Sequence, residues 1–305
     1  MKFVWSSPVS NGLVRVTCLP CLDSPEQASA RKRELDISWA FAAELGRSAV
    51  EISRQGFYVN PESHRVNIQP SVQAACAGKR SIRPEDDLPE FSPATFTTTR
   101  VQVSNETTFG ASRRFISDGR NPVALNFANG VSAGGGFLSG ARAQEEVLCR
   151  SSALFVTLVD DPMYHGHRMR PEPDSTAWSI YSPKVPVFRA DDGAELSEPW
   201  LLSFITCAAP YAPDIGQPES GDLLQIRIRR ILAIARAFGY SSLVLGAWGC
   251  GAFGNDPERT ARDFRTALET EFAGSFSDVV FAIADWSPQR KFLGPFRDVF
   301  AMNAH

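Results

Sequence analysis

Two neighbouring glutamates that follow a run of three glycines are the clearest candidates for chemistry in this chain. The segment consists of Gly134, Gly135 and Gly136, then seven residues, then Gln144, Glu145 and Glu146. Successive glycines lose much conformational entropy on folding, so they make sense where free backbone amides approach an anion or a sugar closely. A carboxyl beside a sugar can protonate the leaving oxygen of a glycosidic bond. The glycines alone could form a mobile surface loop, and the glutamates alone could compensate the dipole of a helix that begins there. The two features together favour a ligand-binding or catalytic site.

A second glycine-rich loop follows the apolar run 243–245. It contains Gly249, Cys250, Gly251, Ala252, Phe253, Gly254 and Asn255. Asp256 and Pro257 mark the start of a helix, and amides between a strand and a helix suit a diphosphate. The spacing matches neither the dinucleotide-binding nor the nucleoside-triphosphate fingerprint. Phe253 is expected to stack on a ribose or base, or to fill the core.

Alternating strand and helix patterns surround both loops. The sequence predicts strands over 98–103, 122–127, 201–207, 242–245 and 279–284, and helices over 106–118, 144–158, 221–238 and 257–272. This order predicts an α/β sheet with helices on both faces. Ligands bind to such sheets at the carboxyl ends of strands, where both glycine loops begin.

The first hundred residues have a different pattern. Residues 25–57 have helical periodicity after a capping Ser24, a small hairpin is expected around 60–63, and the charged segment 79–95 is interpreted as a surface linker. We therefore predict a mainly helical accessory region over 1–97 and a catalytic domain over 98–305.

The overall composition limits the partners of the chain. It has 305 residues, of which 31 are basic and 34 acidic, for a net charge of −3, which argues against direct nucleic-acid binding. No signal peptide or membrane span is readable, so a cytoplasmic protein is expected. Cys18 and Cys21 have metal-knuckle spacing without a second pair, and the pair His165 and His167 is interpreted as a solvated loop, so no metal is predicted.

The two loops resemble those of the bacterial-type poly(ADP-ribose) glycohydrolases, which belong to the macrodomain superfamily. The shared features are the Gly-Gly-Gly and Gln-Glu-Glu strings, the lead-in 126–129 and the loop 249–255. Further similarity lies in 182–189 and 205–210, and the resemblance covers about residues 98–290. It implies a macrodomain-like mixed sheet and the hydrolysis of ADP-ribosyl bonds without a metal or cofactor.

The resemblance also implies roles for individual residues. Glu146 would act as the acid and then the base, Glu145 would bind ribose hydroxyls, and Asn129 would orient the distal ribose. Gly134, Gly135 and Gly136 would allow backbone approach, and Phe253 would pack against the distal ribose. The diphosphate would be held by Gly249, Gly251, Ala252 and Gly254. The residues that contact adenine are not assigned.

Several functions stay open from the sequence. The substrate would be poly(ADP-ribose) or an ADP-ribosylated protein, for example one modified on arginine, and the cleft beyond Glu146 would decide between them. A non-catalytic ADP-ribose reader is disfavoured because it needs no proton donor. The glycine spacing disfavours an oxidoreductase, and a structural protein would leave both loops unexplained.

Overall fold

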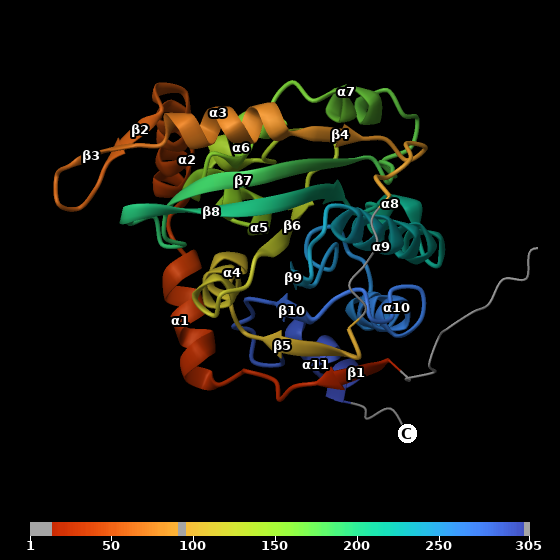
Figure 1. Ribbon diagram of the computed structural model, residues 1–305. Helices are drawn as coiled ribbons and strands as arrows, with labels where there is room; N and C mark the ends of the chain where they lie inside the picture. The colour runs from red at the N-terminus through yellow and green to blue at the C-terminus, as the bar shows by residue number, and fades with distance from the viewer. Residues whose placement is uncertain (1–13, 91–95, 302–305) are drawn as a thin grey trace, which may run out of the picture.

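The computed structural model describes residues 14–90 and 96–301, and its centre is one eight-stranded mixed sheet. The strand order is β1-β5-β10-β9-β6-β8-β7-β4 (Figure 1). Six strands from β1 to β8 run parallel, whereas β7 and β4 are antiparallel to their neighbours. The strands are β1 (Arg15–Cys18), β4 (Arg80–Ile82), β5 (Thr98–Ser104), β6 (Pro122–Ala128), β7 (Ser179–Arg189), β8 (Glu195–Ala208), β9 (Ser242–Leu245) and β10 (Asp278–Ala282).

Helices cover both faces of the sheet, which confirms the predicted fold class (Figure 1). In the N-terminal part they are α1 (Pro25–Leu35), α2 (Trp39–Gln55), α3 (Gln69–Gly78), α4 (Thr108–Ser117), η1 (Phe137–Ser139), α5 (Gln144–Ser151), α6 (Leu154–Leu158) and α7 (Pro162–Arg168). In the C-terminal part they are α8 (Ala212–Ile215), α9 (Glu219–Ala237), α10 (Pro257–Glu269) and α11 (Leu293–Ala301). A separate hairpin is formed by β2 (Phe57–Val59) and β3 (Arg65–Asn67).

Strand β6 shows why the sheet must be covered on both sides. Val123 and Leu125 pack into the core beneath α9, α10 and α11, whereas Ala124 packs into the core that α2, α4, α5 and α6 share. A strand that is apolar on both faces is typical of a parallel sheet between two layers of helices. Among the described residues, no helix combines the length and apolar character that crossing a membrane requires.

The predicted elements are largely confirmed, with two helices divided and one linker wrong. Helix 25–57 is divided into α1 and α2, and helix 144–158 into α5 and α6. The segment 79–95 is not only a linker, because β4 pairs with β7 and buries Ile82 against the core. Residues 91–95 of that segment lie outside the described residues. Strand β7 has no counterpart among the predicted elements.

The accessory region supplies both edges of the sheet. Strand β1 pairs with β5 and β4 pairs with β7, so hydrogen bonds of one sheet cross the predicted boundary at residue 97. Helix α2 also packs against η1 in the first glycine-rich loop. The division into an accessory region over 1–97 and a catalytic domain over 98–305 stays a prediction, and the sheet is shared by both parts.

The two glycine-rich loops leave adjacent strands. Strands β6 and β9 are parallel neighbours, with Val123 opposite Leu243 and Ala124 opposite Val244. The loop with the three glycines follows β6, and the second loop follows β9. Because parallel strands end at the same edge of a sheet, the two loops begin side by side.

Close packing of α2 against η1 leads to a first prediction. A Cβ atom at Gly46 would lie 2.6 Å from the Phe137 carbonyl oxygen, whereas at Gly294 in α11 it would meet nothing closer than 3.7 Å. We expect Gly46→Ala to lower the free energy of unfolding by about 1 kcal/mol or more, because overpacking outweighs the gain in helix propensity. Gly294→Ala is the matched control and should be neutral or stabilising. Denaturant unfolding measures both, and equal effects would contradict the prediction.

Candidate active site

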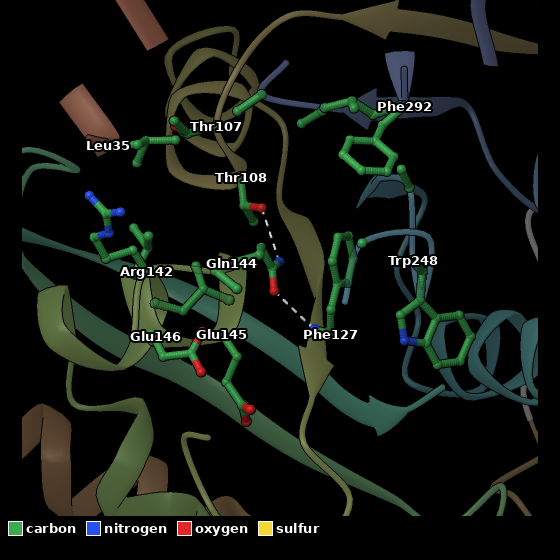
Figure 2. Close-up of a pocket in the computed structure, with 18 of the residues that line it drawn as sticks. Leu35, Thr107, Thr108, Phe127, Arg142, Gln144, Glu145, Glu146, Trp248 and Phe292 are labelled. Carbon is green, nitrogen blue, oxygen red and sulfur yellow. Dashed lines mark hydrogen bonds between the residues drawn. The ribbon is translucent and has the colours of Figure 1, made fainter. Parts of the chain in front are cut away.

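One cavity of about 500 Å³ lies where the two glycine-rich loops meet. Figure 2 shows part of its lining, with Gln144, Glu145 and Glu146 on the first turn of α5 and Trp248 and Phe292 on the opposite side. Of the predicted site residues, the cavity is lined by Asn129, Gln144, Glu145, Glu146, Gly249, Gly251, Ala252 and Phe253. The structure therefore brings both predicted loops to one site.

Gln144 fixes the start of α5 against the sheet. Its Oε1 accepts a hydrogen bond from the Phe127 amide at 2.9 Å (Figure 2). Its Nε2 donates to the Leu125 carbonyl at 2.8 Å. Nε2 also donates to Thr108 Oγ1 at 3.0 Å in α4. These bonds tie one side chain to β6 and α4, so Gln144 holds the glutamates in place.

Glu145 is a buried carboxyl held by the end of β6. Its Oε2 accepts the Asn129 amide at 2.7 Å and its Oε1 accepts from Asn126 Nδ2 at 3.3 Å. Burial, opposed by these hydrogen bonds and assisted by the neighbouring charge of Glu146, raises the pKa of Glu145 to about 8. The fold therefore favours a proton on this carboxyl near neutral pH.

Glu146 is oriented by the glycine loop. Its Oε1 accepts the Gly136 amide at 3.0 Å, and its Oε2 is buried without a hydrogen-bond partner among the described residues. Gly135 has a φ of +57°, and a Cβ atom there would overlap Glu146 Oε1. The three glycines thus lie behind the carboxyls, where they support Glu145 and Glu146, and they do not line the cavity.

Two residues of the second loop, Cys250 and Asn255, have their side chains turned into the protein. The Cys250 thiol is buried, with Sγ 3.5 Å from the Trp248 carbonyl oxygen and 3.6 Å from Thr260 Oγ1. Asn255 donates to the Pro210 carbonyl at 2.9 Å and accepts from Ser220 Oγ at 2.7 Å. Both side chains brace the loop, and neither residue lines the cavity. Gly254 also lies outside the lining, with a φ of +67° that turns the chain towards Pro213.

Phe253 lines the cavity while it packs partly against the core. Its ring meets the Tyr211 ring edge-on, with the centroids 5.7 Å apart. This arrangement leaves the ring part of the cavity wall and supported from behind. The position of Phe253 is therefore compatible with both predicted roles, contact with a ligand and packing in the core.

The sequence missed several lining residues from other elements. Thr107 and Thr108 follow β5, Trp286 and Phe292 follow β10, and Leu35, Arg142 and Asp191 form a further part of the wall. The predicted strands 98–103 and 279–284 could have located the first four, because they come after the carboxyl ends of those strands. No motif or pattern in the sequence around Leu35 or Asp191 indicated that these residues line the site. Arg142 donates to Asp36 Oδ1 at 2.8 Å, so it joins the end of α1 to the site.

The His165 and His167 segment is not simply a solvated loop. His167 is buried, and its Nδ1 lies 2.9 Å from the Gly130 carbonyl oxygen while its Nε2 lies 2.8 Å from Thr176 Oγ1. Burial lowers the pKa of His167, which favours the neutral ring. Arg168 donates to the Val131 carbonyl, so α7 supports the first loop from outside. In the part of the chain that the structure describes, no three His, Cys, Asp or Glu side chains are grouped as metal ligands.

Comparisons with known proteins match this chain to one family. The family model "Microbial-type PARG, catalytic domain" matches residues 46–190. A crystal structure of poly(ADP-ribose) glycohydrolase from Thermomonospora curvata is 40% identical, with a TM-score of 0.80, and the match covers 85% of this chain and 99% of that one. A structure of that protein with the inhibitor ADP-HPD is 39% identical, with a TM-score of 0.78 and the same coverage.

A second organism provides a similar structure. Poly(ADP-ribose) glycohydrolase from Deinococcus radiodurans, in complex with ADP-ribose, is 39% identical with a TM-score of 0.68, and the match covers 77% of this chain and 98% of that one. Among curated protein sequences, none matches this chain.

The buried Glu145 carboxyl predicts a dependence of stability on pH. Its pKa rises from 4.5 to about 8 on folding, so between these values the folded state keeps a proton that the unfolded state releases. The free energy of unfolding should therefore fall as pH rises through this range, by at most about 1.4 kcal/mol per pH unit. Glu145→Gln should remove this part of the decline, and the exposed Glu172→Gln should not. Chemical unfolding at several pH values measures the slopes, and an unchanged slope in Glu145→Gln would refute the argument.

Proposed function

This chain belongs to the microbial-type poly(ADP-ribose) glycohydrolase family, and from that premise we propose that it releases ADP-ribose from poly(ADP-ribose) with Glu146 as the acid and base. One observation carries the proposal. Glu146 lines the same cavity as Gly249, Gly251, Ala252 and Phe253, so the loop can hold the diphosphate of a nucleotide sugar while the carboxyl acts on its ribosyl bond.

The amide-lined loops are expected to orient the substrate. The loop after β9 offers the backbone of Gly249, Gly251 and Ala252 to the diphosphate. Asn129 and Glu145 are expected to bind hydroxyls of the distal ribose, and Phe253 to pack against that ring. These contacts would fix the anomeric carbon beside Glu146, and a fixed geometry accounts for much of the rate enhancement that enzymes achieve.

Glu146 then moves the proton. It donates its proton to the departing 2′-oxygen of the preceding unit as the ribosyl bond breaks, and the carboxylate that remains takes a proton from the attacking water. Two features support this role: Oε1 is held by the Gly136 amide, and the buried Oε2 has no hydrogen-bond partner among the described residues. The bound diphosphate and the carboxylates can share the positive charge that develops on the ribose.

The acid role predicts the effect of an isosteric change. Glu146→Gln keeps the shape of the side chain and its acceptor for the Gly136 amide, but it cannot donate a proton as an acid does. We expect release of ADP-ribose from labelled polymer to fall by roughly 1000-fold, whereas the Kd for ADP-ribose changes by only a few fold. Product release and calorimetric binding measure the two effects. A variant that retains wild-type turnover would show that another group is the acid.

The same assay separates the related substrates. Poly(ADP-ribose), arginine-linked and serine-linked mono-ADP-ribosylated proteins are incubated with the wild-type chain in parallel. Release from the polymer supports the proposal. Release from a mono-ADP-ribosylated protein alone would make the chain a mono-ADP-ribosyl hydrolase. Binding of ADP-ribose without release would make it a reader.

A cytoplasmic location stays a prediction from the sequence.

The support that Gly135 gives to Glu146 can be tested with a matched pair of glycines. Gly135 and Gly119 both have positive φ, +57° and +78°, so alanine at either position strains the backbone by about 1–2 kcal/mol. Only at Gly135 does the added Cβ meet a carboxyl, because at Gly119 it meets nothing within 4 Å. We expect Gly135→Ala to lower kcat by at least about 10-fold and Gly119→Ala to affect only thermal stability. Equal kcat values for the two variants would rule out this role of the loop.

A further inference from the structure

Arg150 is a buried arginine that its surroundings do not explain. The residue is 0% exposed, yet Nε, Nη1 and Nη2 have no hydrogen-bond partner among the described residues. Two other buried arginines differ in this respect, because Arg189 and Arg227 each donate to backbone carbonyls. An unpaired buried charge is costly, so its retention calls for a functional reason.

The position of Arg150 connects it to Glu146. Both residues lie in α5, and Arg150 comes four residues after Glu146, so the two side chains extend from the same face of the helix. Glu146 Oε2 is also buried and unpartnered among the described residues. Arg150 does not line the cavity, whereas Glu146 does. Arg150 therefore lies outside the space that the substrate would occupy.

The charges around this pair favour an effect of Arg150 on Glu146. Asp191, in the turn between β7 and β8, and Glu146 both attract the guanidinium, while Arg142 opposes them. Asp191 Oδ2 accepts from Thr107 Oγ1 at 2.7 Å, and Glu34 and Arg31 of α1 also act on Asp191. Glu146 also interacts electrostatically with Glu145 and with the buried Cys149 thiol. Of these groups, Arg150 is a positive charge within α5 that interacts with Glu146.

A carboxylic acid in this setting needs such a charge. When Glu146 gives up its proton, a negative charge appears in a site with little solvent, and burial disfavours ionisation. A nearby guanidinium offsets that cost. The acid can then release its proton more readily as the glycosidic bond breaks.

We propose that Arg150 is a positioning residue for the glycohydrolase reaction, which acts through Glu146 and supplies, from outside the cavity, the positive charge that lets the Glu146 carboxyl release its proton. The inference rests on the proposed function, because it assumes that Glu146 is the proton donor. The substrate does not contact Arg150, and the guanidinium stays protonated throughout.

Three variants test this role through the pH dependence of kcat on poly(ADP-ribose). Arg150→Met should lower kcat by about 10-fold or more with KM changed by less than about threefold. It should also move the alkaline limb of the profile up by about half a pH unit or more, because Glu146 keeps its proton to higher pH without the charge. Arg150→Lys restores a positive charge, so its limb should stay near that of the wild type. Arg227→Met removes another buried arginine and should lower Tm without moving the limb.

A measurement without substrate separates this inference from the proposed function. The glutamate carboxyls are labelled with carbon-13, and the titration that is missing in Glu146→Gln identifies Glu146. In Arg150→Met its midpoint should move to higher pH, and this holds whether or not the polymer is cleaved. An inactive wild type with a shifted midpoint would overturn the glycohydrolase function and retain the electrostatic link. A midpoint and an alkaline limb that both match the wild type would overturn the role of Arg150.

Discussion

Two adjacent carboxyls must be kept in a nearly dry wall of the cavity, and most of the site serves that requirement. Burial and the charge of Glu146 raise the pKa of Glu145, while amides of Asn129 and Gly136 donate to the two side chains. The first turn of α5 adds the positive end of the helix dipole. Without these donors, the cost of placing two acids side by side would exceed what the local packing can offset.

The sheet makes the arrangement possible because it aligns two loops that are distant in the sequence. Strand β6 leads into the glycines that support the glutamates, and the parallel neighbour β9 leads into the loop 249–255. Gln144 then ties α5 to the backbone of β6. Residues of α5 and of the loop 249–255 therefore line one cavity, and neither segment would form it alone.

The N-terminal region is part of this construction. Strands β1 and β4 complete the edges of the sheet, Leu35 at the end of α1 lines the cavity, and α2 packs on η1. The turn from Gly136 to Gly140 thus packs against both α2 and α5. Its amides can hold Glu146 only while that packing is intact, which gives the first hundred residues a role in the geometry of the site.

The sequence by itself determined the local features of this protein. Asp256 and Pro257 start α10 as expected, the strands before both loops are where the apolar runs predict them, and the glutamates begin a helix. Such features depend on neighbouring residues, so a pattern in the chain is enough to reveal them. The macrodomain-like fold followed from the motifs of the resemblance and is confirmed by the solved structures.

Only the tertiary structure decided what each residue faces. It placed the three glycines behind the carboxyls, turned Cys250 and Asn255 away from the cavity, and brought Leu35 and Asp191 into its wall. It also buried Arg150 completely. These outcomes depend on contacts between segments that are far apart in the chain. The direction of a side chain and the loss of its solvent arise from that packing, and no local spacing encodes them.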